Sequence, residues 1–305
     1  MRALPKVTNI LRAKFRDWLA AFAKGSKLHY AREIHQQALL ANDLLMSIWL
    51  QGNQNHPNPL LKCGKRYFSQ SDEDGIILEI LRRINLPIGV CVEVGCGNGL
   101  ENNTLNLLVR GWRSVWVDAG ALAIDPKCNP ELLSFQQAFV TAENVATITR
   151  RGLSELHATH VDLLSIDVDG NDGYLADALL ASGLEPSVVI IEMNEVIPPP
   201  IRFAQKYDPN YAWDRTKNSG WSLQSLADIA TKYGYICVGC NLHTGVNAFF
   251  VRDTLLQHFS DIPRDLATLY VGRSLPPFKH RDRRAQVTAG LIETLIRGAG
   301  RAQQN

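Results

Sequence analysis

The sequence predicts an α/β fold: a mostly parallel, seven-stranded sheet with helices on both faces and a C-terminal antiparallel β-hairpin. From about residue 70 to 255, short apolar runs alternate with stretches compatible with helices, which is typical of parallel strands joined by helical crossovers. A glycine-rich turn closes the first of these runs. The last two runs are separated only by HTG (243–245), which permits a hairpin but is too short for a helical crossover.

Seven apolar runs are the expected strands. In chain order they are GVCVEVG (89–95), SVWVDA (114–119), QQAFVT (136–141), VDLLSIDVDG (161–170), PSVVIIEMN (186–194), GYICVGCNL (234–242) and VNAFFVRD (246–253). The main domain is expected to span residues 61–258, which contain all these runs. Residues 259–305 are expected to form a basic loop followed by a last helix.

Residues 1–60 are expected to form an N-terminal helical extension. Apolar side chains recur there at helical spacing, with basic residues around them; they are Leu11, Phe15, Leu19 and Phe22. We expect this helix to cover the domain or to join copies of the chain into a homo-oligomer. A basic helix that lies on a membrane surface is the alternative.

The composition is that of a globular protein with one main domain. The chain has 305 residues, 46% of them hydrophobic and 20% charged, which is enough for one sizeable core. Its formal net charge of +2 argues against nucleic acid as a partner, because nucleic-acid surfaces carry a concentrated basic excess. No apolar run approaches the roughly 20 residues of a membrane span, and no signal-peptide pattern is recognised. Six scattered cysteines suit free thiols in a reducing compartment. A cytoplasmic enzyme is therefore expected.

The glycine-rich turn is CVEVGCGNG (91–99). Its spacing, E-x-G-x-G-x-G, differs from the dinucleotide fingerprint G-x-G-x-x-G, and no G-K-[ST] follows as it does in a P-loop. The next strand ends in an acidic residue, Asp118. A nicotinamide-dependent oxidoreductase is thus disfavoured but stays an alternative, together with a non-catalytic module that keeps the ligand crevice.

The glycine turn, Asp118 and the terminal hairpin together resemble the class I S-adenosylmethionine-dependent methyltransferases, whose sheet is Rossmann-like. Further segments are similar to a bacterial group related to the FkbM-type methyltransferases, over roughly residues 62–256; they are FSQSDEDGII (68–77), LLSIDVDGND (163–172), VVIIEMNEV (188–196), YDPNYAWD (207–214) and GCNLHTGVNAFFVRD (239–253). The resemblance implies S-adenosyl-L-methionine as cofactor and O-methylation of a sugar, polysaccharide or secondary-metabolite hydroxyl. The expected partner is then a small-molecule or glycan acceptor.

The cofactor residues are expected at strand ends, because ligands of open α/β sheets lie outside the carboxyl ends of the strands. They are Glu93, Gly95, Gly97, Gly99, Asp118, Thr141 and Asp167. The glycines allow a ligand to approach the backbone closely, and Asp118 can accept ribose hydroxyls, with a helix N-cap as the alternative. Glu93 is expected to orient the loop or to meet the cofactor ammonium through water. Thr141 is expected to border the adenine, with ordinary loop polarity as the alternative.

Acidic side chains crowd the ends of the fourth and fifth strands. SIDVDGND supplies Asp167, Asp169 and Asp172, and EMNE supplies Glu192 and Asn194. Because oxygen ligands suit a hard cation, Asp167, Glu192 and Asn194 are the expected ligands of Mg²⁺ or Mn²⁺. A carboxylate with a raised pKa could instead act as a general base, and Asp169 is the candidate. In a third interpretation, Asp167 contacts the cofactor while Asp169 and Asp172 cap the following turn and helix.

A hydroxyl acceptor requires a base because its pKa lies far above neutrality. His243, in the hairpin turn, is a second candidate, because an imidazole has a pKa near 6.5 and can accept a proton near neutral pH. Alternatively, His243 hydrogen-bonds its own turn. The aromatic and polar segment YDPNYAWDRTKNSGWS (207–222) suits stacking on a sugar or flat ring. We expect this segment to form a lid over the acceptor; alternatively, it is an arm that packs against the sheet. The residues expected to contact the substrate are Tyr207, Tyr211, Trp213 and Asp214.

Overall fold

A computed structural model describes residues 44, 56–213, 216, 218–272 and 284–299. All of these except Leu44 belong to one compact unit, which spans Trp49–Pro276 and Asp282–Asn305. The expected N-terminal helix, which was expected to cover the domain or to join copies of the chain, lies outside the described residues, and so does Asp214.

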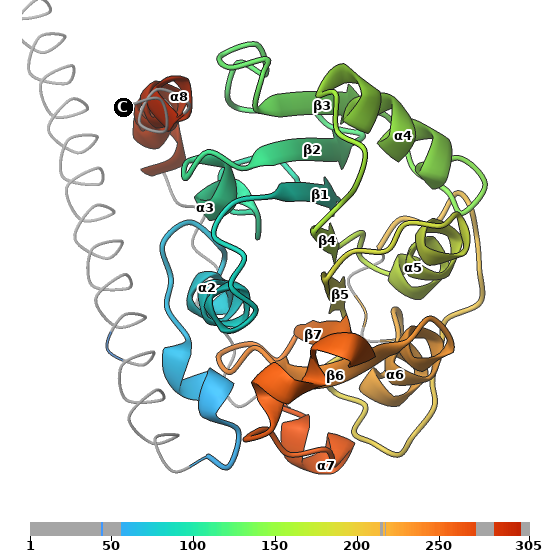
Figure 1. Cartoon of the computed structure of the whole chain (residues 1–305). Helices are drawn as coiled ribbons and strands as arrows, with labels where there is room; N and C mark the ends of the chain where they lie inside the picture. The colour runs from blue at the N-terminus through green and yellow to red at the C-terminus, as the bar shows by residue number, and fades with distance from the viewer. Residues whose placement is uncertain (1–43, 45–55, 214–215, 217, 273–283, 300–305) are drawn as a thin grey trace, which may run out of the picture. The chain divides into compact units, whose positions relative to one another are not determined.

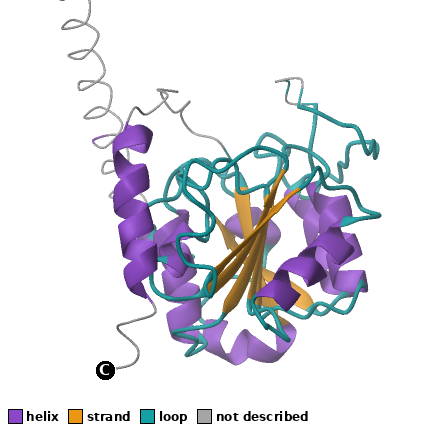
Figure 2. Ribbon diagram, turned by 90° about the horizontal axis from the view of Figure 1, so that it is seen from above, coloured by secondary structure: helices purple, strands orange, loops and turns teal. Residues whose placement is uncertain are grey.

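The unit is built on one seven-stranded sheet (Figures 1 and 2). Its strands are β1 (Val90–Val94), β2 (Arg113–Asp118), β3 (Leu133–Gln137), β4 (Leu163–Ile166), β5 (Val188–Glu192), β6 (Tyr235–Cys240) and β7 (Asn247–Arg252). Their spatial order is β3-β2-β1-β4-β5-β7-β6. Strands β1 to β5 are parallel, whereas β7 is antiparallel to both of its neighbours. The predicted α/β class, the mostly parallel sheet and the C-terminal antiparallel hairpin are confirmed.

Helices cover the sheet on both faces, as Figure 1 shows. One face carries α2 (Glu73–Arg83), α3 (Leu105–Leu108) and α8 (Arg284–Ala299); the other carries α4 (Val145–Glu155), α5 (Asp172–Ala181) and α6 (Leu223–Lys232). Short helical turns complete the unit: η1 (Pro59–Cys63), η2 (Asp253–Phe259) and α7 (Leu266–Leu269). Because both faces are covered, the central strands are continuous apolar runs; every residue of β1 is buried. Among the described residues, no helix combines the length and the apolar composition that crossing a membrane requires.

The third strand is the main correction to the sequence prediction. It spans Leu133–Gln137, not 136–141, and the apolar residues that suggested the later range form a loop in which Phe139 is 55% exposed. The true strand, LSFQQ, has only two apolar residues, Leu133 and Phe135. Its Gln136 is buried because its Nε2 donates to Ser134 Oγ (2.8 Å) and to Glu155 Oε2 (2.7 Å) under α4. A buried polar side chain with partners is tolerated in a strand, but the pattern of hydrophobicity alone does not reveal it.

The C-terminal helix α8 packs beside the turns that follow β1 and β2. Ile292 and Ile296 are buried in an apolar cluster that includes Trp116 of β2. Two polar contacts fix the helix: Asp125 N donates to Glu293 Oε1 (3.0 Å), and Asn129 Nδ2 donates to the carbonyl oxygen of Ile296 (2.9 Å). The predicted last helix is therefore part of the same compact unit as the sheet.

Candidate functional site

The glycine turn after β1 lies between the ends of β2 and β4. Gly95 N donates to Val117 O and Gly97 N to Asp118 Oδ2, both at 2.8 Å. A Cβ added to Gly95 would lie 1.7 Å from Asp167 O, whereas one added to Gly97 would have no protein atom within 4 Å. Both glycines have positive φ, +89° and +57°, a conformation that favours glycine. Gly95 is thus required by the contact with β4, and Gly97 is where a ligand can approach the backbone.

Gly99 serves packing within the protein. Its φ is +77°, and an added Cβ would lie 2.8 Å from Cζ3 of Trp116. The indole of Trp116 is fully buried and donates from Nε1 to Thr104 Oγ1 (2.8 Å). The glycine therefore lets the end of the turn lie directly on the sheet's largest buried side chain.

Glu93 holds the residues that follow the glycine turn. Its side chain is only 2% exposed. Oε1 accepts from Asn103 N (2.8 Å), and Oε2 accepts from Asn102 Nδ2 (2.8 Å), Thr104 N (2.9 Å) and Thr104 Oγ1 (2.5 Å). Burial raises the pKa of Glu93, while these donors lower it. Because a carboxylate has about four acceptor positions, the geometry matches the loop-orienting role and leaves little capacity for a ligand.

Asp118 joins the glycine turn to the turn after β2. In addition to Gly97 N, it accepts from Gly120 N through Oδ1 (2.7 Å). Each carboxylate oxygen keeps a second lone pair, so the half-buried Asp118 can still accept hydroxyl groups. Thr141, the expected adenine neighbour, lies in the loop between β3 and α4, where its N–H donates to Asn144 Oδ1 (2.8 Å).

Asp167 and Glu192 meet at the ends of the neighbouring strands β4 and β5. Their carboxyl groups are hydrogen-bonded to each other, which requires a proton between them. Burial and the nearby carboxylates raise the pKa of Asp167 to about 8, and the same causes raise the pKa of Glu192 well above its ordinary value. Burial and neighbouring carboxylates disfavour ionisation, so both pKa values are shifted toward the neutral form.

Asp172 caps the turn that begins α5. It is 1% exposed, and it accepts from Val168 N and Gly170 N at 2.8 Å each. Burial raises the pKa of Asp172 to about 7. Asp169, by contrast, is exposed in a left-handed conformation with φ +61°, and its N–H donates to Glu192 Oε2 (3.2 Å). The capping interpretation thus fits the contacts of Asp172, and Asp169 is the carboxylate that is accessible.

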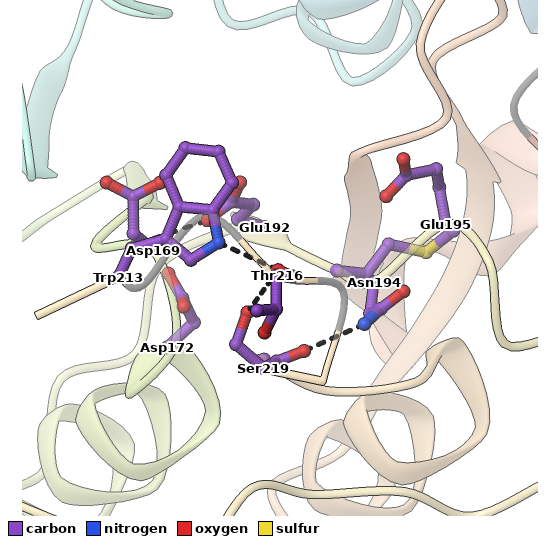
Figure 3. Close-up of a pocket in the computed structure, with 10 residues that line it drawn as sticks. Asp169, Asp172, Glu192, Asn194, Glu195, Trp213, Thr216 and Ser219 are labelled. Carbon is purple, nitrogen blue, oxygen red and sulfur yellow. Dashed lines mark hydrogen bonds between the residues drawn. The ribbon is translucent and has the colours of Figure 1, made fainter. Parts of the chain in front are cut away.

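A small polar pocket of about 90 Å³ opens beside these carboxylates (Figure 3). It is lined by Asp169, Asp172, Glu192, Met193, Asn194, Glu195, Trp213, Thr216, Ser219 and Gly220. Figure 3 shows Trp213 close to Asp169 and Glu192, with Glu195 on the opposite side.

The segment after β5 lines the pocket with its second half. Its two ends are joined, because Asn194 N donates to Trp221 O (2.7 Å), and residues 203–205 run antiparallel to residues 220–222. Of the four expected substrate residues, Trp213 lines the pocket. Tyr211 instead packs on Gly170, whose added Cβ would lie 2.6 Å from Tyr211 Cε1. Tyr207 bonds away from the pocket, to the loop between β3 and α4.

The three expected metal ligands do not form an open donor set. Asp167 and Glu192 are bonded to each other, and the Asn194 amide is used by the backbone: Nδ2 donates to Ser219 O (2.8 Å) and Oδ1 accepts from Val196 N (3.1 Å). In the part of the chain that the structure describes, no group of three or more His, Cys, Asp or Glu side chains is placed to hold a metal ion. The residues present therefore do not fit the expected Mg²⁺ or Mn²⁺, and we derive no step through a metal.

The hairpin turn that carries His243 is fixed by a buried acidic cluster, Asp72 and Glu73, at the start of α2. Asp72 accepts from Leu242 N (2.8 Å) and His243 N (3.0 Å). Glu73 accepts from Asn241 Nδ2 (3.0 Å) and from Asn247 Nδ2 (3.2 Å). Burial lowers the pKa of His243, and His243 is not among the residues that line the pocket.

The sequence analysis did not identify this cluster as part of the site. Its only signal was the run SDEDG, which reads equally well as the acidic first turn of a helix. The partners of these acids are about 170 positions later in the chain, so the contact is invisible in a local pattern.

Comparisons with known proteins add no family. No family model matches the chain, and a search of the curated proteins finds no match.

Proposed function

We propose that this protein is a class I S-adenosylmethionine-dependent methyltransferase with a Rossmann-like sheet, and that it methylates a hydroxyl group of a sugar, polysaccharide or secondary metabolite. The observation that carries the proposal lies between β1 and β4, where the strand order reverses. Open α/β sheets bind ligands at such a switch point. Asp118, Gly97 and Asp167 meet there through the contacts of the glycine turn.

The residues at the switch point suit the nucleoside and amino-acid parts of this cofactor. Gly97 has open space in front of its backbone, Asp118 has free lone pairs for a ribose diol, and Glu93 keeps the turn rigid. Thr141 lies in the loop after β3, on the side of the sheet beyond Asp118. When bound, S-adenosylmethionine supplies an electrophilic methyl group.

Asp169 is the base that we assign to the acceptor hydroxyl. It lines the pocket and is exposed there. Because its neighbours are also acidic, the protonated form of Asp169 is favoured, and the carboxylate keeps a proton that it takes from the acceptor. Asp167 and Glu192 lie beside it, and their raised pKa values limit the negative charge of the site. His243 is assigned no proton transfer, because it does not line the pocket.

Trp213 forms the wall of the same pocket. An aromatic face next to carboxylate and amide groups is a common way to hold a sugar or a flat polyhydroxylated ring. Closing such a wall over the acceptor also removes water from the reacting groups.

Calorimetric titration with S-adenosylmethionine, S-adenosylhomocysteine and NAD tests the proposal. We expect both sulfur nucleosides to bind and NAD not to bind. Binding of NAD alone would favour an oxidoreductase, and binding of the sulfur nucleosides without turnover on any hydroxylated acceptor would favour a non-catalytic module. The cytoplasmic location stays a prediction. The Mg²⁺ or Mn²⁺ requirement expected from the sequence is untested, and the contacts of Asn194 argue against it.

A further inference from the structure

Tyr207 connects two parts of the sheet's carboxyl edge that are far apart in the sequence. Its hydroxyl donates to Glu143 Oε2 (2.6 Å) and accepts from Ala142 N (3.0 Å). Its ring lies against Tyr174 of α5, with ring centroids 4.9 Å apart. Tyr207 comes from the segment after β5, whereas its two polar partners belong to the loop between β3 and α4.

The segment around Tyr207 crosses the first turn of α5 on its way to that loop. Tyr174 Oη donates to Gln205 O (2.8 Å), and Asn171 Nδ2 donates to Asp208 O (2.8 Å). Both donors lie just after β4. The segment is thus attached at the ends of β4 and β5 by contacts that do not involve Tyr207, and at the end of β3 by Tyr207.

We infer that Tyr207 is a positioning residue that couples cofactor binding to the closure of the acceptor lid, residues 203–213. This inference rests on the proposed function, in which the loop after β3 borders the cofactor. A ligand that contacts this loop restricts Ala142 and Glu143, the two groups that hold the Tyr207 hydroxyl. Six residues later in the same segment, Trp213 forms the wall of the pocket. The cofactor therefore binds first, and the lid then forms the acceptor site.

The exposure of the contact suits a reversible latch. Glu143 is exposed and Tyr207 is half-buried, so water competes for this hydrogen bond and its net contribution in the free protein is small. A contact of that kind opens and closes in the resting protein, and a ligand shifts the balance by restricting one side of it. The Tyr207 hydroxyl lowers the pKa of Glu143, which is consistent with a bond to the charged carboxylate.

Hydrogen exchange followed by mass spectrometry tests the coupling without an acceptor. Amide exchange in peptides covering residues 203–213 is measured with and without saturating S-adenosylhomocysteine. In the unmodified protein we expect the nucleoside to slow this exchange about threefold to tenfold, as expected for fixing one charged hydrogen bond. In Tyr207→Phe the slowing should disappear, while the Kd for S-adenosylhomocysteine changes by less than about threefold.

Two further variants separate coupling from a merely structural role. Glu143→Ala should behave as Tyr207→Phe does, whereas Glu143→Gln keeps an acceptor and should retain part of the slowing. Tyr233→Phe is the matched control, because the Tyr233 hydroxyl also donates to a carboxylate, Asp177 Oδ1 (2.8 Å), but Tyr233 follows the end of α6. It should leave the slowing unchanged.

Each outcome decides a different point. If S-adenosylhomocysteine does not bind the unmodified protein, the proposed function is overturned and the coupling with it. If it binds and slows exchange equally in Tyr207→Phe, the coupling is overturned and the proposed function stands. If Tyr207→Phe abolishes nucleoside binding, Tyr207 is itself a ligand contact and the positioning role is overturned.

Discussion

Replacing Glu93 by Gln tests how the glycine turn is held in place. The carboxylate accepts four hydrogen bonds, one at Oε1 and three at Oε2. The new amide will place its NH₂ group at the Oε1 position, because there it opposes one donor rather than three. The N–H of Asn103 then loses its partner inside the protein.

The magnitude follows from this change of partners. A buried N–H without an acceptor costs about 1–3 kcal/mol, and the three remaining bonds fall to roughly half their strength because the acceptor is no longer charged. The neutral amide is easier to bury than the carboxylate, whose pKa is raised by burial, and this offsets part of the loss. The net effect should be a loss of about 2–4 kcal/mol in the free energy of unfolding.

The assay is thermal unfolding, with nucleoside binding measured in parallel. A loss of that size lowers Tm by about 3–6 °C in a protein of this length, and S-adenosylhomocysteine should bind more weakly because the turn is loosened. Glu101→Gln is the control, since Glu101 is exposed in the same loop and should leave both values unchanged. A Glu93→Gln variant with the Tm and nucleoside affinity of the unmodified protein would refute the assigned role of Glu93.

Four other predictions address the rest of the site. Asp118→Ala should weaken S-adenosylmethionine binding at least about tenfold, because a hydrogen bond to a charged acceptor contributes roughly 1.5–3 kcal/mol; unchanged affinity in calorimetry would remove Asp118 from the cofactor site. Trp213→Ala should raise the acceptor KM or lower kcat by about tenfold, the size of a stacking contact, and equal losses of acceptor and cofactor affinity would contradict its place in the acceptor wall. Because the folded-state pKa of Asp167 is about 8 and the unfolded value is about 3.9, the folded protein binds more protons between these values and its stability falls as pH rises from 4 to 8. In Asp167→Asn this fall should be shallower when Tm is followed from pH 5 to 8, and an identical slope would argue against the raised pKa. Activity should persist in EDTA after dialysis, because the three expected metal ligands do not form an open donor set. Loss of activity in EDTA with recovery in Mg²⁺ or Mn²⁺ would instead support the metal expected from the sequence.

The sequence predicted the class of fold because that information is local. A strand covered on both faces is buried throughout, as VCVEV of β1 is, and its apolar run, interrupted only by Glu93, is readable without any partner. The hairpin was readable for a similar reason, since a three-residue gap leaves room for no other connection. The glycine turn and Asp118 follow from the same strands and were located by their position at the strand ends.

The prediction of the third strand was wrong because this strand depends on contacts with residues elsewhere in the chain. The strand has only two apolar residues, Leu133 and Phe135, and its buried Gln136 is stabilised by Ser134 and by Arg151 and Glu155 of the next helix. The exposed Phe139 then gave a false apolar signal just beyond the strand. A pattern of hydrophobicity registers the side chain but not its partner.

The sequence by itself thus located six of the seven strands, the hairpin and the residue types at the carboxyl edge. Only the tertiary structure decided what each of those residues contacts. It separated Gly97, which has open space, from Gly99, which packs on Trp116. It also turned Tyr207 away from the pocket toward Glu143 and joined the acids at the start of α2 to the hairpin. Hydrogen bonds and close contacts depend on distance in space, and residues far apart in the chain become neighbours only when the sheet has formed.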